Sequence, residues 1–262
     1  KVALITGAAG GIGSATANKF LKEGCCVILT DIDSKALQQT KESFQNKFGT
    51  DVVKSIVMDV TKENDVKKAV DESINKFGGI DILVANAGFA SAAPFDKTSS
   101  KLWDKNMAVL SKGCFLISRE VYSQMMRQNI GGSIIFISSK NSLSASKGAS
   151  AYSVAKSSLL HLSRSIALEG AEHKIRSNII NPDAVIQNSR IWSGDWKKQR
   201  AAGNNIPINK VEEFYKNRSL LKVSVLPEDI AEGIYFFASS KSKKSTGNII
   251  NIDGGNITSF TR

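Results

Sequence analysis

The strongest constraint on the fold is a regular alternation between short apolar runs and longer stretches of helical period. Segments with helical period lie at 34–48, 65–77, 102–127 and 151–169. The apolar runs between and around them indicate buried strands, at 2–6, 26–30, 52–58, 80–86, 133–138, 177–181 and 248–252. Nearly continuous apolar strands separated by helices indicate a parallel sheet covered on both faces. We therefore predict one doubly wound, Rossmann-like α/β domain over residues 1–262, with a parallel sheet of about seven strands.

The first predicted strand leads into a glycine-rich turn at residues 6–13 and then into a helix. Glycines allow the backbone to approach a pyrophosphate closely, and a helix N-terminus supplies N–H groups and partial positive charge. The glycine spacing differs from the common dinucleotide fingerprint and from a P-loop. A structural turn would also explain the glycines. We predict a nucleotide site whose contacts in this turn are Gly7, Gly11, Ile12 and Gly13.

A carboxylate at the end of the second strand indicates which nucleotide the site binds. Asp31 stands eighteen residues after Gly13. A carboxylate there can accept hydrogen bonds from the adenosine ribose, and its charge repels a 2′-phosphate. No arginine or lysine directly follows Gly7 or Asp31. We therefore expect NAD rather than NADP, the alternative being that Asp31 caps the helix that begins at Ser34.

Several motifs follow one another along the chain in the order and at the spacings that resemble those of the short-chain dehydrogenase/reductase family. The resemblance covers essentially the whole chain. The glycine-rich turn is similar to the family's cofactor turn, and Tyr152 and Lys156 match its Tyr-x-x-x-Lys motif. Ser139 stands thirteen residues before Tyr152, which is the family's spacing for a catalytic serine. The other matching positions are Asp59-Val60, where the family contacts adenine, Asn86-Ala87-Gly88 after the fourth strand, and Asp253-Gly254-Gly255 after the last.

The resemblance implies that Ser139, Tyr152 and Lys156 are catalytic. The pair Tyr152 and Lys156 shares one helix face, because the residues are four apart. A neighbouring ammonium, together with an oxidised nicotinamide, should lower the pKa of Tyr152 from its usual value of about 10. Tyr152 could then exchange a proton with a substrate hydroxyl while hydride moves to or from the nicotinamide. The implied cofactor contacts are Asp59, Val60, Asn86, Ala87, Gly88, Tyr152, Lys156, Pro182 and Val185.

The chain departs from the family pattern at two places. The family usually has asparagine seven residues after the Trp of its Trp-Asp pair, where it helps to hold a water of the proton relay. Counted from Trp103, that position is Leu110, and Asn106 lies one helical turn earlier. The second departure is Asp183, which follows Pro182 where the family generally has glycine. We therefore expect the proton relay to use another group or to be slower. We expect Asp183 to add a carboxylate near the nicotinamide.

Four stretches are more similar to one subgroup, the dehydrogenase part of the bifunctional rhamnulose-1-phosphate aldolase/alcohol dehydrogenases. They are 138–141, 181–185, 189–192 and 220–229. In that subgroup an aldolase domain precedes the dehydrogenase, so the resemblance implies a fused or separate aldolase domain. It also implies oxidation of lactaldehyde or of a related small hydroxy-aldehyde or polyol. An aldehyde could react through its hydrate, which presents a hydroxyl to Tyr152.

The irregular stretch 187–222 is predicted to be a lid over the substrate, since long loops in compact domains tend to be functional. It carries aromatic and basic residues that could close over a small polar or anionic substrate, although solvent-facing lysines above packed tryptophans would also explain it. A sugar-alcohol phosphate dehydrogenase is therefore the alternative function. The predicted substrate contacts are Lys140, Asn141, Asp183, Arg190 and Trp192.

The remaining features favour a cytoplasmic enzyme without a metal. Cys25, Cys26 and Cys114 fit neither a disulfide framework nor metal-ligand spacing, and His161 and His173 lack acidic or cysteine neighbours at ligand spacing. We expect neither a signal peptide nor a membrane span.

The net charge of +11 is spread along the chain without a nucleic-acid-binding motif, so we expect no nucleic-acid partner. Small and apolar residues on the helices 102–127 and 151–169 resemble the family's subunit interface, which implies a homotetramer or, failing that, a dimer. A cofactor-binding protein with weak catalysis is a further alternative, which Leu110 keeps open.

Overall fold

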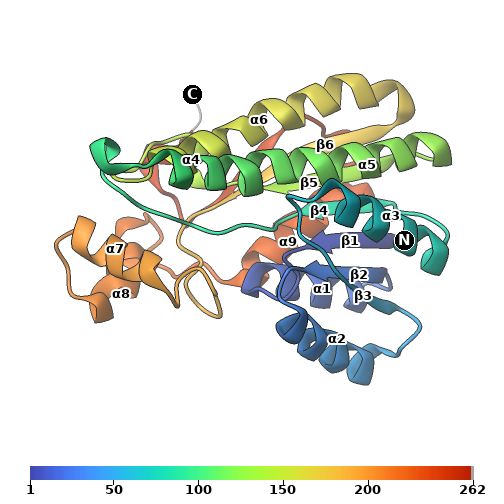
Figure 1. The fold of residues 1–262 in the computed structure, drawn as a ribbon, viewed down its shortest axis with the longest axis horizontal. Coiled ribbons are helices and arrows are strands. Elements are labelled where there is room, and N and C mark those ends of the chain that lie inside the picture. Colours follow the sequence, from blue (N-terminus) through green and yellow to red (C-terminus); the bar gives the residue numbers. More distant parts are fainter. Residues whose placement is uncertain (261–262) are drawn as a thin grey trace.

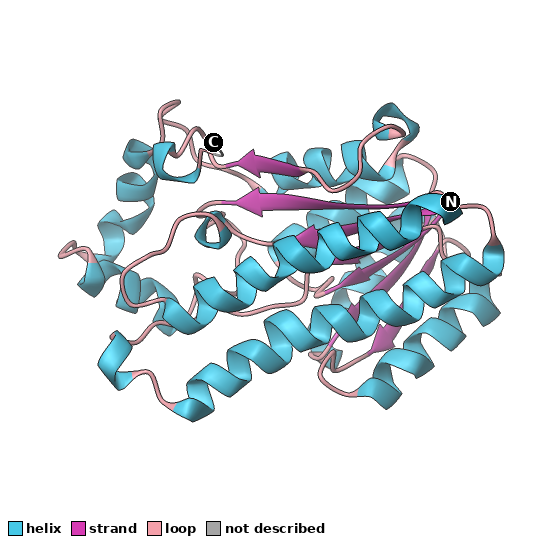
Figure 2. Cartoon of the chain, turned by 90° about the horizontal axis from the view of Figure 1, so that it is seen from above, coloured by secondary structure: helices cyan, strands magenta, loops and turns pink. Residues whose placement is uncertain are grey.

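A computed structural model describes residues 1–260 of the chain. Its strands form one seven-stranded sheet of order β3-β2-β1-β4-β5-β6-β7, and every neighbouring pair is parallel. The strands point the same way in Figure 2. The prediction of a doubly wound, Rossmann-like fold is confirmed. The strands are β1 (Val2–Thr6), β2 (Cys26–Asp31), β3 (Val53–Val57), β4 (Ile82–Ala85), β5 (Gly132–Ile137), β6 (Ile175–Pro182) and β7 (Ile249–Ile252).

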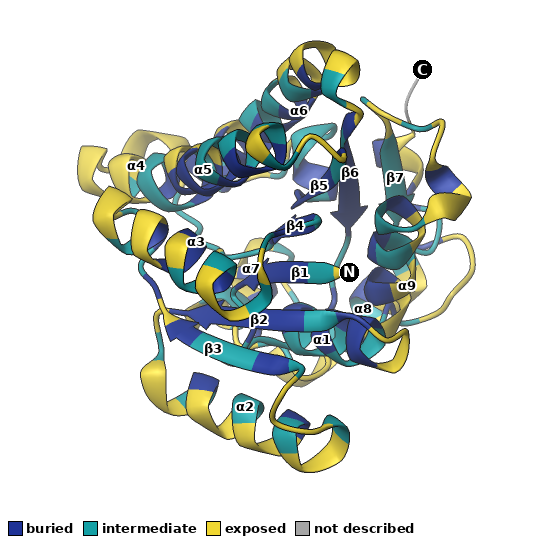
Figure 3. Ribbon diagram, turned by 90° about the vertical axis from the view of Figure 1, so that its right-hand side faces the viewer, coloured by how far each residue is buried: buried dark blue, intermediate teal, exposed yellow. Residues whose placement is uncertain are grey.

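Helices cover both faces of the sheet (Figure 1). The helices are α1 (Gly11–Lys22), α2 (Ser34–Phe48), α3 (Glu63–Phe77), α4 (Ser100–Asn106), α5 (Gly113–Gln128), α6 (Ser150–Gly170), α7 (Asp195–Gly203), α8 (Val211–Arg218) and α9 (Pro227–Ala238). One apolar core lies between the sheet and α1, α2 and α9, and a second lies between the sheet and α3, α5 and α6. Figure 3 shows the buried strands between these layers. Burial on both faces explains why the strands are apolar almost throughout.

The helix predicted over 102–127 is not one regular α-helix. The structure has α4 and α5 joined by a π-helical turn at Met107–Lys112. Leu110 lies in this turn and is fully buried. Such a turn contains one residue more than an α-helical turn, and π turns occur frequently at functional sites.

The segment 187–222 is more ordered than the predicted loop. It contains α7 and α8, which lie to one side of the sheet in Figure 1. Trp192, Ala201, Val211 and Tyr215 form a small apolar core of its own. None of the helices within residues 1–260 combines the length and the apolar character that a bilayer span requires.

Candidate active site

The glycine-rich turn joins β1 to α1 in a conformation that excludes side chains. Gly7 has φ +65°, and a Cβ there would lie 2.9 Å from the Cα of Ala87. A Cβ on Gly13 would lie 2.2 Å from the carbonyl oxygen of Gly7. Gly10, at the N-cap of α1, has no side chain to bond the first N–H groups of the helix. These groups are therefore available to phosphate oxygens.

The Asn-Ala-Gly motif attaches β4 to the same turn. The Thr6 hydroxyl accepts hydrogen bonds from the amides of Asn86 and Ala87, both at 2.9 Å. The side-chain amide of Asn86 donates to the carbonyls of Thr6 (2.9 Å) and Gly7 (3.1 Å). Both N–H bonds of this amide are thus used within the protein, so the motif fixes the shape of the turn.

A cavity of about 700 Å³ runs from the turn toward the end of β2. Its volume suits a large ligand such as a dinucleotide. It brings together most of the predicted cofactor contacts, which are Gly7, Gly11, Ile12, Asp31, Asp59, Val60, Asn86, Ala87 and Gly88. Gly13 lies behind the turn as a packing position, while Pro182 and Val185 line a neighbouring cavity with the predicted catalytic residues.

Asp31 ends β2 at the end of this cavity where we expect the adenosine of a cofactor (the adenosine end), and it is 7% exposed. Its carboxylate accepts hydrogen bonds from the amides of Ala9 (3.1 Å) and Asp33 (3.0 Å). Asp33, and not Asp31, caps α2, because its side chain accepts from the amide of Ala36 at 3.0 Å. The alternative explanation of Asp31 as a helix cap is therefore wrong.

The structure places Arg190 away from the predicted substrate contacts. Its guanidinium lies 3.6 Å from Asp31 and 3.2 Å from Asp33, at the adenosine end of the large cavity. Asn188, two residues before Arg190, has φ +56°. Its carbonyl oxygen would lie 2.7 Å from a Cβ on Gly11. This part of the segment therefore rests on the cofactor turn. No arginine or lysine directly follows Asp31 in the sequence, but the fold brings Arg190 to it from 159 residues further along the chain.

Ser139, Tyr152 and Lys156 line a second cavity, of about 120 Å³, beside the large one. Ser139 follows β5, and its hydroxyl accepts from the amide of Asn141 at 3.2 Å. Tyr152 and Lys156 lie on the first turns of α6. The ammonium of Lys156 donates to the carbonyl of Ile137 at 2.7 Å. The three predicted catalytic residues thus share one cavity wall.

The pKa of Tyr152 differs from the predicted direction in the protein by itself. Burial raises it to about 12, and a hydrogen bond with Ser139 only partly opposes this. Burial also lowers the pKa of Lys156, whose ammonium already donates to a carbonyl. The neighbouring ammonium therefore does not outweigh burial. Without a bound cofactor, Tyr152 therefore keeps its proton at neutral pH.

Leu110 fills the position at which the family has asparagine. Its Cδ2 atom would lie 3.0 Å from a Cβ on Gly88, and the ammonium of Lys156 would lie 3.9 Å from the same point. Asn106 does not replace the missing amide, because it donates to the carbonyl of Leu102 (2.7 Å) and to the hydroxyl of Ser91 (2.9 Å). Lys156 thus has an apolar neighbour where the family pattern has a polar one.

Three of the predicted substrate residues form a polar wall of the smaller cavity. Lys140 donates to the hydroxyl of Ser146 at 2.8 Å, and that hydroxyl donates to Asn141 at 2.9 Å. Asp183 is paired with Arg218 and accepts from Asn256 at 2.9 Å. Arg218 was missed in the sequence, although a carboxylate in place of the usual glycine required a partner.

Aromatic residues of the segment 187–222 close the cavity. The ring of Trp196 lies 5.8 Å from that of Tyr152, and Trp192 packs edge-on against Tyr215 at 5.1 Å. Trp192 lines the cavity as predicted, and Trp196, Arg200 and Tyr215 join it.

Comparison with known proteins gives consistent results. The family model described as Enoyl-(Acyl carrier protein) reductase matches residues 7–256. The oxidoreductase YuxG of Bacillus subtilis (strain 168) is 50% identical over 262 residues, which are 100% of this chain and 38% of YuxG. The chain thus spans well under half the length of that relative. The resemblance to the bifunctional aldolase subgroup stays a prediction.

Two solved structures have the same fold along nearly their whole length. Sorbitol-6-phosphate 2-dehydrogenase SrlD from Erwinia amylovora has a TM-score of 0.92 and 29% identity, covering 97% of this chain and 98% of its own. A 3-ketoacyl-(acyl-carrier-protein) reductase from Brucella melitensis, complexed with NADH, has a TM-score of 0.84 and 25% identity, covering 98% of both. The chain is an oxidoreductase of the short-chain dehydrogenase/reductase family, whose members bind a nicotinamide cofactor.

Proposed function

We propose that this chain is an NAD-dependent dehydrogenase that transfers hydride between nicotinamide and a small hydroxylated substrate, such as lactaldehyde or a related hydroxy-aldehyde or polyol. One observation carries the proposal. Ser139, Tyr152 and Lys156 line a cavity that also contains Asn86, Gly88 and Pro182, at the carboxyl ends of the central strands. In open α/β sheets, ligands bind at this edge.

The residues present fit a nicotinamide cofactor, because the glycine turn admits no side chains and the larger cavity begins there. When bound, the cofactor supplies or accepts the hydride. Ser139 and Tyr152 would hold the reacting oxygen, and Tyr152 would give or take its proton. For an aldehyde, the hydrate would present that hydroxyl.

The preference for NAD is supported by the buried carboxylate of Asp31, which stands at the adenosine end of the large cavity. A fixed negative charge there favours ribose hydroxyls and repels a 2′-phosphate. Arg190 opposes this effect in part, since its guanidinium lies 3.6 Å from Asp31.

The substrate class is supported by the size and polarity of the second cavity. A volume of about 120 Å³ suits a molecule of a few carbons better than a steroid or long acyl chain. An apolar ligand against Lys140, Asn141 and Asp183 would also displace water from these polar groups, at a cost of about 1–3 kcal/mol for each hydrogen bond that is lost. A sugar-alcohol phosphate dehydrogenase is the second candidate, favoured by the Erwinia amylovora similarity and by the basic residues of the cavity.

Turnover of the Tyr152→Phe variant tests the assignment. NAD reduction would be followed with lactaldehyde, small diols, sugar alcohols and their phosphates. We expect the variant to lose activity by a factor of about 10² to 10⁴ while NAD affinity stays within a few-fold, because only the proton-transferring hydroxyl is removed. Tyr122→Phe, on α5, is the matched control and should keep full activity. Substantial residual activity in Tyr152→Phe would show that the proton moves by another route. Failure of the unaltered chain to reduce NAD with any substrate would instead favour a cofactor-binding protein.

We further propose a homotetramer formed through α5 and α6, in the cytoplasm, and a longer protein or a partner that contributes an aldolase domain. Exposed apolar side chains on these helices, including Phe115, Val154 and Leu168, support an interface. Light scattering at micromolar concentration should give the mass of four chains. A monomer would contradict the assembly.

A further inference from the structure

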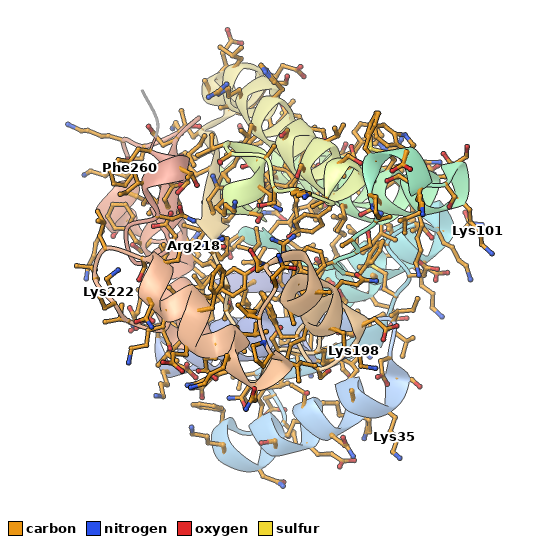
Figure 4. The ribbon with its side chains drawn as sticks, turned by 90° about the vertical axis from the view of Figure 1, so that its left-hand side faces the viewer. Lys35, Lys101, Lys198, Arg218, Lys222 and Phe260 are labelled. Carbon is orange, nitrogen blue, oxygen red and sulfur yellow. The ribbon has the colours of Figure 1, made fainter. Side chains whose placement is uncertain are left out.

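The substrate cavity carries more positive than negative side chains. Lys140, Lys156, Arg200 and Arg218 line it together with a single carboxylate, that of Asp183. Asp183 is engaged by Arg218 and by the side-chain amide of Asn256. Figure 4 shows Arg218 at the end of α8 that lies nearest the sheet. Lys156 belongs to the reacting end and donates to the carbonyl of Ile137. This leaves Lys140 and Arg200 as the other lining cations without a carboxylate of their own.

Arg200 is the more unusual of these two cations. It extends from α7, is 7% exposed, and packs over the ring of Trp196 at 5.4 Å. Its Nε donates to the hydroxyl of Tyr215 and one terminal nitrogen donates to the carbonyl of Lys147, both at 3.0 Å. No carboxylate of residues 1–260 lies within 4.0 Å of it. Buried charges are normally paired, and a guanidinium has five N–H donors, so most of this group's bonding capacity is unused.

Lys140 faces the same cavity and is 6% exposed. Its ammonium donates to the hydroxyl of Ser146 at 2.8 Å and to the carbonyl of Ser144 at 3.5 Å. Burial lowers the pKa of Lys140, and the negative charge of Asp183 opposes that effect. A second negative charge in the cavity would stabilise its charged form further.

The position of Trp196 relates these cations to the reacting group. Its ring lies 5.8 Å from the ring of Tyr152 and 5.4 Å from the guanidinium of Arg200. Tyr152 and Arg200 line the same small cavity, so a short ligand with its hydroxyl at Tyr152 can reach Arg200. The pyrophosphate turn belongs to the other cavity, which Arg200 does not line.

We propose that the substrate carries an oxyanion, a phosphate or a carboxylate, at one end of a short hydroxylated chain, bound by Arg200 with Arg218 and Lys140. This inference rests on the proposed function, because Tyr152 defines the reacting end, and it favours a phosphorylated or carboxylated substrate over lactaldehyde, which carries no oxyanion. Arginine is suited to the role, since its planar fork matches the geometry of carboxylate and phosphate oxygens. The cavity's excess charge and small volume then both restrict the substrate.

Binding to the Tyr152→Phe protein, saturated with NADH, tests the proposal separately from turnover. Calorimetry would compare glycerol 3-phosphate and glycerate with uncharged glycerol. We expect at least one anion to bind tenfold or more tightly than glycerol, and the stronger of the two identifies the oxyanion. Arg200→Gln should remove most of this difference, and Arg200→Lys should restore part of it. Lys198→Gln is the matched control, because Lys198 lies on the same helix but is exposed and paired with Asp195 (Figure 4).

Two results would overturn the inference. In the first, neither anion binds more tightly than glycerol, including the case in which none of the three binds. In the second, Arg200→Gln weakens glycerol and the anions equally, which indicates a structural role. Failure of the proposed function has a different signature, namely that the unaltered chain reduces NAD with no substrate whether or not the anions bind.

Discussion

The two neighbouring cavities each hold a carboxylate paired with an arginine, but the two ion pairs differ in how exposed they are and in how many other contacts they make. At the adenosine end, Arg190 is 47% exposed and is shared between Asp31 and Asp33 at 3.6 and 3.2 Å. At the substrate end, Arg218 and Asp183 are 28% and 14% exposed. Arg218 also packs over the ring of Tyr215 at 4.4 Å.

The difference shows how one type of contact can serve two purposes. An exposed, divided ion pair is screened by solvent and contributes about 0–1 kcal/mol, so a ligand can displace it at little cost. A partly buried pair with further hydrogen bonds is costly to break, since the remaining charge loses its partner. We therefore interpret Arg190 as a replaceable neighbour of Asp31 and Arg218 as a fixed part of the substrate cavity.

The largest expected contrast is in stability. Arg218→Gln should lower the free energy of unfolding by about 2 kcal/mol, because it leaves Asp183 partly buried without its cation. Arg190→Gln should change it by less than about 0.5 kcal/mol. Urea unfolding of the two variants beside the unaltered chain measures both. Equal losses would remove the distinction between the pairs.

A smaller effect is expected in cofactor binding. Asp31→Asn should weaken NAD binding about tenfold and reduce the discrimination against NADP, because charged hydrogen bonds to the ribose contribute about 1.5–3 kcal/mol. Asp183→Asn should leave NAD affinity within about twofold, since this residue lies outside the adenosine end. Calorimetric titration with both cofactors provides the comparison. Tighter binding of NADP than of NAD by the unaltered chain would refute the proposed preference.

The last expected effect is on the pH dependence of stability, and it comes from Tyr152 in the smaller cavity. The pKa of Tyr152 is raised by burial to about 12, above its ordinary value of 10.0. The folded state therefore retains this proton where the unfolded state has lost it. The stability from this group is complete below pH 10 and is lost as pH rises toward 12. Tyr152→Phe should show a shallower loss of stability between pH 10 and pH 12, because the titrating hydroxyl is absent. Parallel curves for the two proteins would show that Tyr152 titrates normally.

The positions of Asp31, Ser139, Tyr152 and Lys156 in the fold could be predicted because they follow from local patterns. Asp31 and Ser139 stand at or just after the ends of strands, and parallel strands bring those ends to one edge of the sheet. Tyr152 and Lys156 are fixed relative to each other by one turn of α6.

The arginines of the segment 187–222 could not be placed in this way. Arg190 meets Asp33 across 157 residues, and Arg218 meets Asp183 across 35. Their positions depend on how α7 and α8 pack on each other and on the sheet edge. Both helices are short, of nine and eight residues, and have few apolar positions from which a period could be recognised.

The close approach of Asn188 to Gly11 affects how genetic variants of this protein should be interpreted. A Cβ on Gly11 would meet the carbonyl oxygen of Asn188 at 2.7 Å. Trp192, four residues further along, lines the substrate cavity. An alanine at Gly11 would therefore displace a chain segment that belongs to the substrate side as well. A loss-of-function phenotype at this glycine cannot be assigned to the cofactor alone, because one residue is a steric determinant of both ligand sites.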